Sequence, residues 1–203
     1  MAMKINLTFK FSILARLISL LIVVVLGINS IGLSTVNALS GSSFNPGFII
    51  SDANFYNGYS LDSTAIQNWL NAQVPNCDTN GTQATTHSNG AGGFYTRAQW
   101  GSINNNPAPF TCLKNYRQDV GTVSANSYCG AIGSGNKSAA EILMNVGRAC
   151  NVSPMVLLVL LQKEQGLVTD DWPWNSQYKA ATGFGCPDTA ACDTNYAGFF
   201  NQV

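Results

Sequence analysis

Charged side chains are scarce in this chain. Of its 203 residues, 10% are Asp, Glu, Lys or Arg, against roughly 25% in a typical soluble domain. No basic cluster is present that could neutralise several phosphates, so nucleic acid is not an expected partner. Solubility must come instead from Asn, Ser, Thr and Gly side chains.

Histidine and glutamate are almost absent. The chain has one histidine, His87, in the polar stretch "TTHSNG", and two glutamates, Glu141 and Glu164. A Ser-His-Asp or Cys-His catalytic site would have to use His87 alone, and a lone histidine in a polar loop is usually solvated. No C-x-x-C pair occurs, so the spacing does not favour zinc. We expect neither a metal site nor a cofactor.

The first 38 residues have the layout of a secretory leader. Three basic residues precede an apolar run, and the small residues "VNA" follow it at the point where a signal peptidase would cut. The apolar segment 17–33 approaches the roughly 17 to 25 residues that span a bilayer, so an uncleaved membrane anchor is the alternative. Both interpretations place residues 39–203 outside the cytoplasm, at the cell surface or beyond, with the leader as the only expected contact with a membrane.

Removing the leader changes the charge balance. Residues 1–38 hold three of the ten basic residues and no acidic residue, so seven positive and ten negative side chains remain. The remainder of the chain is therefore mildly acidic.

All six cysteines lie beyond the leader. An even number in a secreted chain predicts disulfides rather than free thiols. Six cysteines allow 15 connectivities. Short loops favour Cys186 with Cys192, and one arrangement open to the other four is Cys77 with Cys112 and Cys129 with Cys150.

Residues 39–137 are expected to be loop-rich with one helix. The segment "FIISDANFY" is compatible with a short strand or an ordered arm. The segment "CDTNGTQATTHSNGAGG", residues 77–93, has no hydrophobic period and many turn formers, which predicts a loop.

The one helix expected in that region is "SLDSTAIQNWLNAQVP". Ser60 or Asp62 can cap its start, and the proline stops it. Ile66, Trp69 and Leu70 share one side at i, i+3 and i+4, so this side is expected to face the core.

A second helix is predicted in "KSAAEILMNVGRAC". Ser138 stands as the N-cap with Glu141 three residues later, the spacing in which each side chain satisfies a backbone N–H at the helix start. Glu141 therefore has a structural role. Ile142, Leu143 and Val146 supply the buried side.

A third helix is predicted in "SPMVLLVLLQKEQG", where Ser153 caps the start, Pro154 takes the first helical position and Gly166 ends the run. Residues 155–161 are all apolar, which predicts a helix with no solvent-facing side along that length.

Glu164 shares one side of that helix with three leucines, Leu157, Leu160 and Leu161. We expect its carboxyl group to emerge where the buried helix reaches the surface. Partial burial there would favour the protonated form, which a general acid needs near neutral pH. The alternative is that "QKEQG" is only the polar end of a core helix.

The segment that follows, "LVTDDWPWNSQYKAATGFGCPDTAACDTNYAGFF", combines aromatic rings with amide and hydroxyl groups. This mixture suits the binding of a sugar polymer. Buried aromatics in a small disulfide-rich domain would give the same pattern.

Two sets of motifs resemble known families. The stretch "NVSPMVLLVLLQKEQGL" resembles the catalytic helix of the lysozyme-like superfamily, specifically goose-type lysozymes and soluble lytic transglycosylases. The stretches "FNPGFIISDANFY", "KEQGLVTD", "YKAATGFGCPDT" and "YAGFFNQV" resemble a group of secreted actinobacterial-type, haemagglutinin-like cell-wall proteins. Gln165 departs from the pattern, because transglycosylases usually have Ser after the glutamate.

The resemblance implies a mainly α fold. Residues 138–203 would form a lysozyme-like helical domain stabilised by disulfides, preceded by the loop-rich region 39–137 and the signal peptide. Members of the haemagglutinin-like group continue beyond "GFFNQV", so the resemblance also implies that the catalytic region is truncated here.

The resemblance also implies a function: a secreted muramidase or lytic transglycosylase that cleaves peptidoglycan, or another N-acetylated glycan, with Glu164 as the general acid. Asp170 or Asp171 would position a water or be solvated loop residues. The glycan would be held by Gln177, Tyr178, Thr182 and Asp170. The alternatives are a non-catalytic, adhesin-like cell-wall or glycan-binding protein on the same fold, and a secreted structural protein with no affinity for glycans.

Overall fold

The computed structural model describes residue 41 and residues 45–203, so the predicted leader, residues 1–38, lies outside the described residues. The chain divides into two units, Met1–Ile49 and Ile50–Val203, and the second contains helices α2 to α8 and strands β1 to β4. Within the part of the chain that the structure describes, no helix has both the length and the apolar character needed to cross a membrane.

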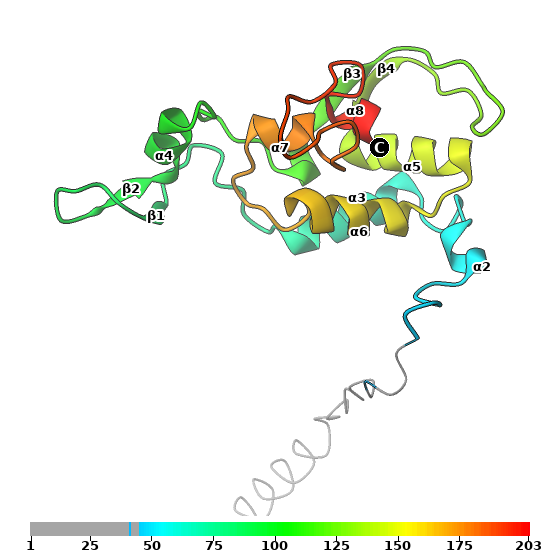
Figure 1. Ribbon diagram of the computed structural model, residues 1–203, viewed down its shortest axis with the longest axis horizontal. Coiled ribbons are helices and arrows are strands. Elements are labelled where there is room, and N and C mark those ends of the chain that lie inside the picture. The colour runs from blue at the N-terminus through cyan, green and yellow to red at the C-terminus, as the bar shows by residue number, and fades with distance from the viewer. Residues whose placement is uncertain (1–40, 42–44) are drawn as a thin grey trace, which may run out of the picture. The chain divides into compact units, whose positions relative to one another are not determined.

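The second unit is built from short helices and two small antiparallel hairpins (Figure 1). The helices are α2 (Asp52–Phe55), α3 (Ser63–Gln73), α4 (Arg97–Ile103), α5 (Ala139–Cys150), α6 (Pro154–Gln165), α7 (Asn175–Lys179) and α8 (Phe199–Gln202), with a 3-10 turn η2 (Leu113–Asn115). The strands are β1 (Ala84–Ser88), β2 (Phe94–Thr96), β3 (Arg117–Val120) and β4 (Gly135–Ser138), paired as β1–β2 and β3–β4. The fold is therefore mixed rather than mainly α.

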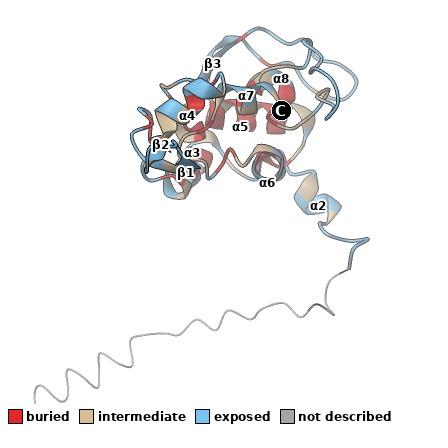
Figure 2. Ribbon diagram, turned by 60° about the vertical axis from the view of Figure 1, so that its left-hand side comes forward, coloured by how far each residue is buried: buried red, intermediate tan, exposed pale blue. Residues whose placement is uncertain are grey.

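The core lies where α5 packs against α3 and α6 (Figure 2). Ile142 and Leu143 of α5 are fully buried, together with Ile66 of α3 and Leu161 of α6. This burial follows from the amphipathic pattern of α5, whose start is fixed by the predicted capping box of Ser138 and Glu141. Residues from both sides of position 137 contribute to one continuous core.

The region 39–137 contains more regular structure than the sequence predicts. Its described residues hold three α-helices rather than one, because α2 forms within "FIISDANFY" and α4 follows β2. The predicted loop 77–93 contains strand β1, and His87 lies on that strand, with its ring stacked on Trp100 at 3.8 Å. Pairing with β2 makes "ATTHS" a strand, and a pattern of local turn formers does not reveal such a partner.

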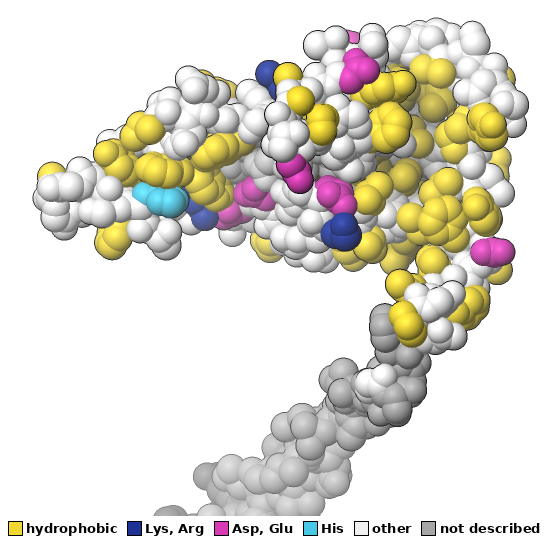
Figure 3. All heavy atoms as spheres, in the orientation of Figure 1, with side chains coloured by type: hydrophobic (Ala, Val, Ile, Leu, Met, Phe, Trp, Pro, Cys, Tyr) yellow, Lys and Arg dark blue, Asp and Glu magenta, His cyan; other side chains and the backbone are white. Residues whose placement is uncertain are grey.

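Helix α6 is not buried on all sides, contrary to the sequence prediction. Its caps are the predicted ones, but Met155 is 51% exposed and Val159 is 64% exposed. These two residues are four apart and lie on the same, exposed side of α6. Trp69 of α3, expected in the core, is 40% exposed. Figure 3 shows hydrophobic side chains open to solvent across the face that carries α6.

The prediction that the six cysteines form disulfides is confirmed, as is the short-loop pair Cys186–Cys192. Cys77 bonds Cys112, Cys129 bonds Cys150, and Cys186 bonds Cys192, with sequence separations of 35, 21 and 6 residues. Disulfides of this kind form and persist in oxidising compartments.

A buried charge cluster connects the β1–β2 hairpin to the segment after α6. Arg97, at the start of α4, lies 3.3 Å from Asp78 and 2.9 Å from Asp171. Asp78 also accepts hydrogen bonds from the backbone N–H groups of Thr82 and Gln83. Burial raises the pKa of Asp78, but these N–H groups, the Thr82 hydroxyl and Arg97 outweigh it, so the pKa lies below its usual value of 3.8.

The Asp78 cluster is expected to make stability pH-dependent. A carboxyl group whose folded pKa is lowered contributes stability above its unfolded pKa, about 3.9, and loses it as pH falls through the folded pKa. Asp78→Asn is therefore expected to lower the free energy of unfolding by about 2 kcal/mol at pH 7. The variant should also lose stability less steeply than wild type below about pH 4. Urea unfolding at several pH values measures both effects. Asp188→Asn, in an exposed loop, is the matched control; equal pH profiles for wild type and Asp78→Asn would contradict the assignment.

Candidate active site

Glu164 lies in the last turn of α6, just before Gly166 ends the helix in a left-handed conformation (φ 66°). Its side chain is 32% exposed, and its Oε1 accepts a hydrogen bond from Lys163 Nζ at 2.7 Å. The carboxyl group is therefore more open to water than the sequence predicts. The side chain of Lys163 is 75% exposed, and an ion pair this exposed contributes little and is easily displaced.

Gly183 lies directly beside the Glu164 carboxylate. A Cβ atom added to Gly183 would be 3.6 Å from Oε2 of Glu164. Gly183 has φ +75°, a backbone conformation that other residues adopt only with strain. Glycine at this position therefore both makes the turn and keeps one side of the carboxylate uncovered.

The loop that carries Gly183 is held by Gln202 of α8. Gln202 is buried; its Nε2 donates to the carbonyl oxygens of Phe184 (2.8 Å) and Tyr196 (2.6 Å), and its Oε1 accepts from Thr182 N (3.1 Å). The disulfide from Cys186 closes the same loop. One side chain and one disulfide thus fix the surface that faces Glu164.

Two aromatic rings stand open on this loop. Phe184 is 60% exposed and Tyr196 is 42% exposed, and their rings meet edge to face with centroids 4.8 Å apart. Phe184 follows Gly183 directly. Exposed aromatic rings provide flat apolar surfaces on which sugar rings can lie.

The four residues predicted to hold a glycan have internal partners. Gln177 donates to the Gln165 carbonyl (2.8 Å) and to Asp170 Oδ2 (2.9 Å), and its Oε1 accepts from Trp174 N. Asp170 Oδ1 accepts from Trp172 N (3.0 Å). These groups join the end of α6 to the start of α7, so they position the site and leave little capacity to bind a ligand.

Tyr178 and Thr182 also form hydrogen bonds within the fold. Tyr178 is 5% exposed, stacks on Tyr116 and donates to the Thr111 carbonyl at 2.6 Å; burial raises the pKa of its hydroxyl well above the usual value. Its ring is closed to a ligand, contrary to the sequence prediction. Thr182 donates from Oγ1 to the Gln202 carbonyl at 2.7 Å.

The Glu164 side chain is partly open to solvent. A hollow of about 390 Å³ lies next to it along α6, where Lys163 and Gln162 meet Trp69, Val159 and Val168. Glu164 is not in the wall of this hollow.

Sequence reasoning missed Gln202, Gly183, Phe184 and Tyr196 as parts of the site. The stretch "GFFNQV" carries two amides, Asn201 and Gln202, next to two phenylalanines, and an amide that is buried with such residues needs a hydrogen-bond partner; nothing local shows which of the two is buried. Nothing local marks Gly183 as the neighbour of Glu164.

Comparisons of the chain with protein-family models, with curated proteins and with solved structures find no match. Function is therefore inferred from the residues of the site.

Proposed function

We propose that this protein is a secreted glycosidase that cleaves peptidoglycan, with Glu164 as its general acid. The observation that carries the proposal is the position of the Glu164 carboxylate, which is anchored by a core helix and faces a glycine in a rigid loop. Exposed Phe184 and Tyr196 on that loop would support the sugar rings. The disulfides and the predicted leader support secretion.

The reaction would use one carboxyl group. Hydrolases with two carboxylates need a second group roughly 5 to 9.5 Å from the first. The carboxylates nearest in sequence are engaged elsewhere: both oxygens of Asp170 accept hydrogen bonds, and Asp171 is paired with Arg97. We infer that the substrate itself supplies the nucleophile that attacks the anomeric carbon.

The proposed step conserves all atoms. The Glu164 carboxyl donates its proton to the oxygen that links N-acetylmuramic acid to N-acetylglucosamine, and the bond from that oxygen to the anomeric carbon breaks. A hydroxyl of the same sugar then bonds to the anomeric carbon and returns its proton to Glu164. No water is consumed. Before this step, the substrate displaces the ammonium group of Lys163 from Glu164.

Mass spectrometry of the soluble products tests this mechanism. After incubation with purified peptidoglycan, we expect muropeptides that are one water lighter than hydrolysis products. Fully hydrated muropeptides would contradict the internal nucleophile but keep Glu164 as the acid. Release of no soluble muropeptide would contradict the enzymatic proposal.

The contact between Lys163 and Glu164 favours a second candidate, a wall-binding protein in which the carboxylate is idle. Glu164 Oε1 is already paired at 2.7 Å, and the two aromatic rings would bind glycan without cleaving it. This candidate predicts co-sedimentation with peptidoglycan and no fall in turbidity with time.

A further inference from the structure

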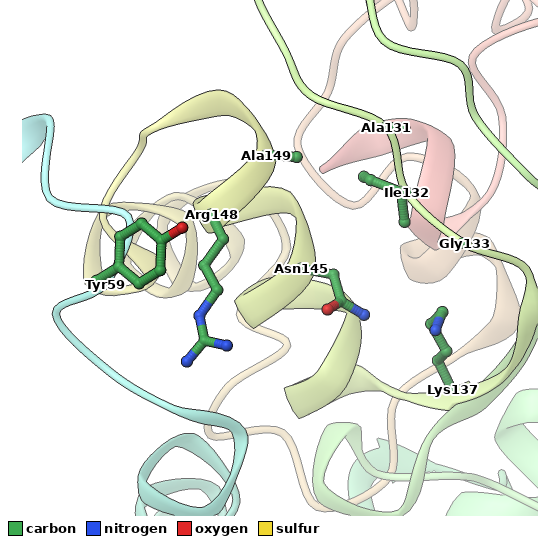
Figure 4. Close-up of a pocket in the computed structure, with 8 residues that line it drawn as sticks. All are labelled: Tyr59, Ala131, Ile132, Gly133, Lys137, Asn145, Arg148 and Ala149. Carbon is green, nitrogen blue, oxygen red and sulfur yellow. The ribbon is translucent and has the colours of Figure 1, made fainter.

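A second cavity, of about 310 Å³, lies on the opposite side of α5 from its buried face and is distinct from the Glu164 site. Asn145, Arg148 and Ala149 of α5 form one wall, at i, i+3 and i+4. Lys137 of β4 and residues 131–133 form the other wall, and Tyr59 closes one end. Figure 4 shows the Asn145 side chain between those of Arg148 and Lys137, with the Tyr59 ring beside the Arg148 guanidinium.

Among the described residues, neither cation of this cavity forms an ion pair with a carboxylate. Residues 45–203 contain seven basic side chains, and four of them have partners: Arg97, Arg117 and Lys163 form ion pairs, and Lys114 donates to a backbone carbonyl. Among the described residues, the other three, Lys137, Arg148 and Lys179, form no ion pair or side-chain hydrogen bond. Two of these three, Arg148 and Lys137, therefore line one cavity of a mildly acidic protein, on either side of Asn145, and no carboxylate lines it.

The nearest carboxylate in sequence is directed elsewhere. Glu141 Oε2 accepts from Ser138 N at 2.7 Å and lies 3.6 Å from Arg117. The hydrogen bonds from Ser138 lower the pKa of Glu141, and Lys137 adds a smaller long-range effect. Glu141 therefore stays charged in its helix cap rather than neutralising the cavity.

Backbone contacts build one end of the cavity. A Cβ atom on Gly58 would lie 2.2 Å from the Gly147 carbonyl oxygen, so only glycine lets this segment reach α5. The hydroxyls of Ser60 and Ser153 lie 2.9 Å apart and fix the same segment. The Tyr59 ring is thereby held 5.3 Å from the Arg148 guanidinium carbon, a cation–π contact that orients Arg148.

The opposite wall is tied to the end of α5. Gly130 N donates to the Ala149 carbonyl at 2.7 Å, and the Cys129–Cys150 disulfide joins the same two segments. Residues 131–133 are thus held over the cavity. The backbone on both sides of the cavity is therefore fixed by hydrogen bonds, close packing or a disulfide.

We propose that this cavity binds the phosphate group of a phosphorylated polyol or sugar. A guanidinium and an ammonium supply two positive charges, which match the dianion of a phosphate monoester or two successive groups of a phosphodiester chain. The Asn145 amide and the Tyr59 hydroxyl add neutral hydrogen-bonding groups for the polyol. The volume exceeds that of a bare ion, so part of the organic group would also lie inside.

The test uses the full chain at low salt, because surface electrostatics weaken as salt screens them. Inorganic phosphate, glycerol 1-phosphate, poly(glycerol phosphate) and acetate are each titrated and followed by calorimetry and by amide NMR shifts. Phosphate and its esters are expected to shift the amides of Gly133, Asn145 and Ala149. Arg148→Gln and Lys137→Gln should each weaken binding at least about tenfold, while Lys179→Gln removes the same charge and should leave it unchanged.

The possible results of this titration distinguish a specific phosphate site from non-specific binding of anions. Equal weakening by Lys179→Gln, or acetate binding as tightly as phosphate, would overturn the proposal, as would shifts that appear away from the cavity. Urea unfolding of Arg148→Gln should match wild type because this side chain is exposed, so a lost fold cannot mimic a lost site. Tighter binding of the polymer than of the monoester would assign the ligand to a phosphodiester chain, and the reverse would assign it to a free monoester. Cleavage of peptidoglycan is not a readout here, so either proposal can fail alone.

Discussion

Replacing Glu164 by Gln is expected to reduce the release of soluble muropeptides from peptidoglycan at least about 100-fold. Glutamine keeps the size of the side chain but has no proton to donate, and general acid catalysis by one group contributes roughly 10² to 10⁴ in rate. Because Glu164 is at the surface end of α6 and its partner Lys163 is exposed, the substitution should leave the fold intact. Turbidity loss and mass spectrometry of the soluble fraction measure the rate.

The other glutamate provides the matched control. Glu141→Gln makes the same chemical change in a helix cap, where the amide can still accept the Ser138 N–H hydrogen bond. We expect it to lower stability by less than about 1 kcal/mol and to leave cleavage within about twofold of wild type. Undiminished cleavage by Glu164→Gln would reject the mechanism. A variant and a wild type that both bind peptidoglycan and both fail to cleave it would support the wall-binding candidate.

The helices that sequence predicts well are those whose ends are decided locally. Ser138 and Glu141 form the expected capping box, and Ser153 and Gly166 start and end α6 as expected. These signals involve residues within four positions of each other, so one sequence contains all the information. Of the disulfides, only Cys186–Cys192 was predictable from a short loop, which closes most readily, because the other four cysteines still allow three pairings.

The features that sequence does not reveal depend on partners far along the chain. The run from Met155 to Leu161 is apolar on every side, and only the arrangement of α3 and α5 decides that Val159 stays exposed. Strand β1 exists because β2 pairs with it. In each case the local pattern is compatible with several tertiary environments.

The surroundings of the candidate site also depend on residues far along the chain. Glu164 stands out in sequence because it follows an apolar helix, and the structure places it at the end of that helix. Its surroundings were not predictable. Gly183 is 19 positions away in the printed sequence, and Gln202, which holds the loop, bonds the Phe184 carbonyl across 18 positions. The amide of Gln177 and the hydroxyls of Tyr178 and Thr182 looked suited to a glycan, but each is engaged in a hydrogen bond within the fold, whereas Phe184 and Tyr196 are exposed.

Removing the Cys77–Cys112 disulfide, by changing both residues to Ser, is expected to lower the free energy of unfolding more than removing any other disulfide. It closes the longest loop, 35 residues, against 6 for Cys186–Cys192. The loop-entropy relation gives about 4 kcal/mol for the first and about 2 kcal/mol for the second. Cys112 is also fully buried, so a serine hydroxyl there adds an unpaired polar group. Urea unfolding of the two double variants measures the difference.

The rate of muropeptide release is expected to fall more on removal of Cys186–Cys192 than on removal of Cys77–Cys112, which is the reverse of the expected order of stability losses. Cys186–Cys192 closes the loop whose carbonyl groups at Phe184 and Tyr196 are held by Gln202, and that loop faces Glu164 through Gly183. Its removal should lower the rate of muropeptide release at least about tenfold at a temperature where the variant is still folded, because positioning of substrate at the acid is lost. The Cys77–Cys112 variant, compared at a temperature where it too is folded, should cleave at close to the wild-type rate. If loss of the longer loop impaired cleavage more than loss of the shorter one, the loop beside Glu164 would not be the surface on which the glycan lies.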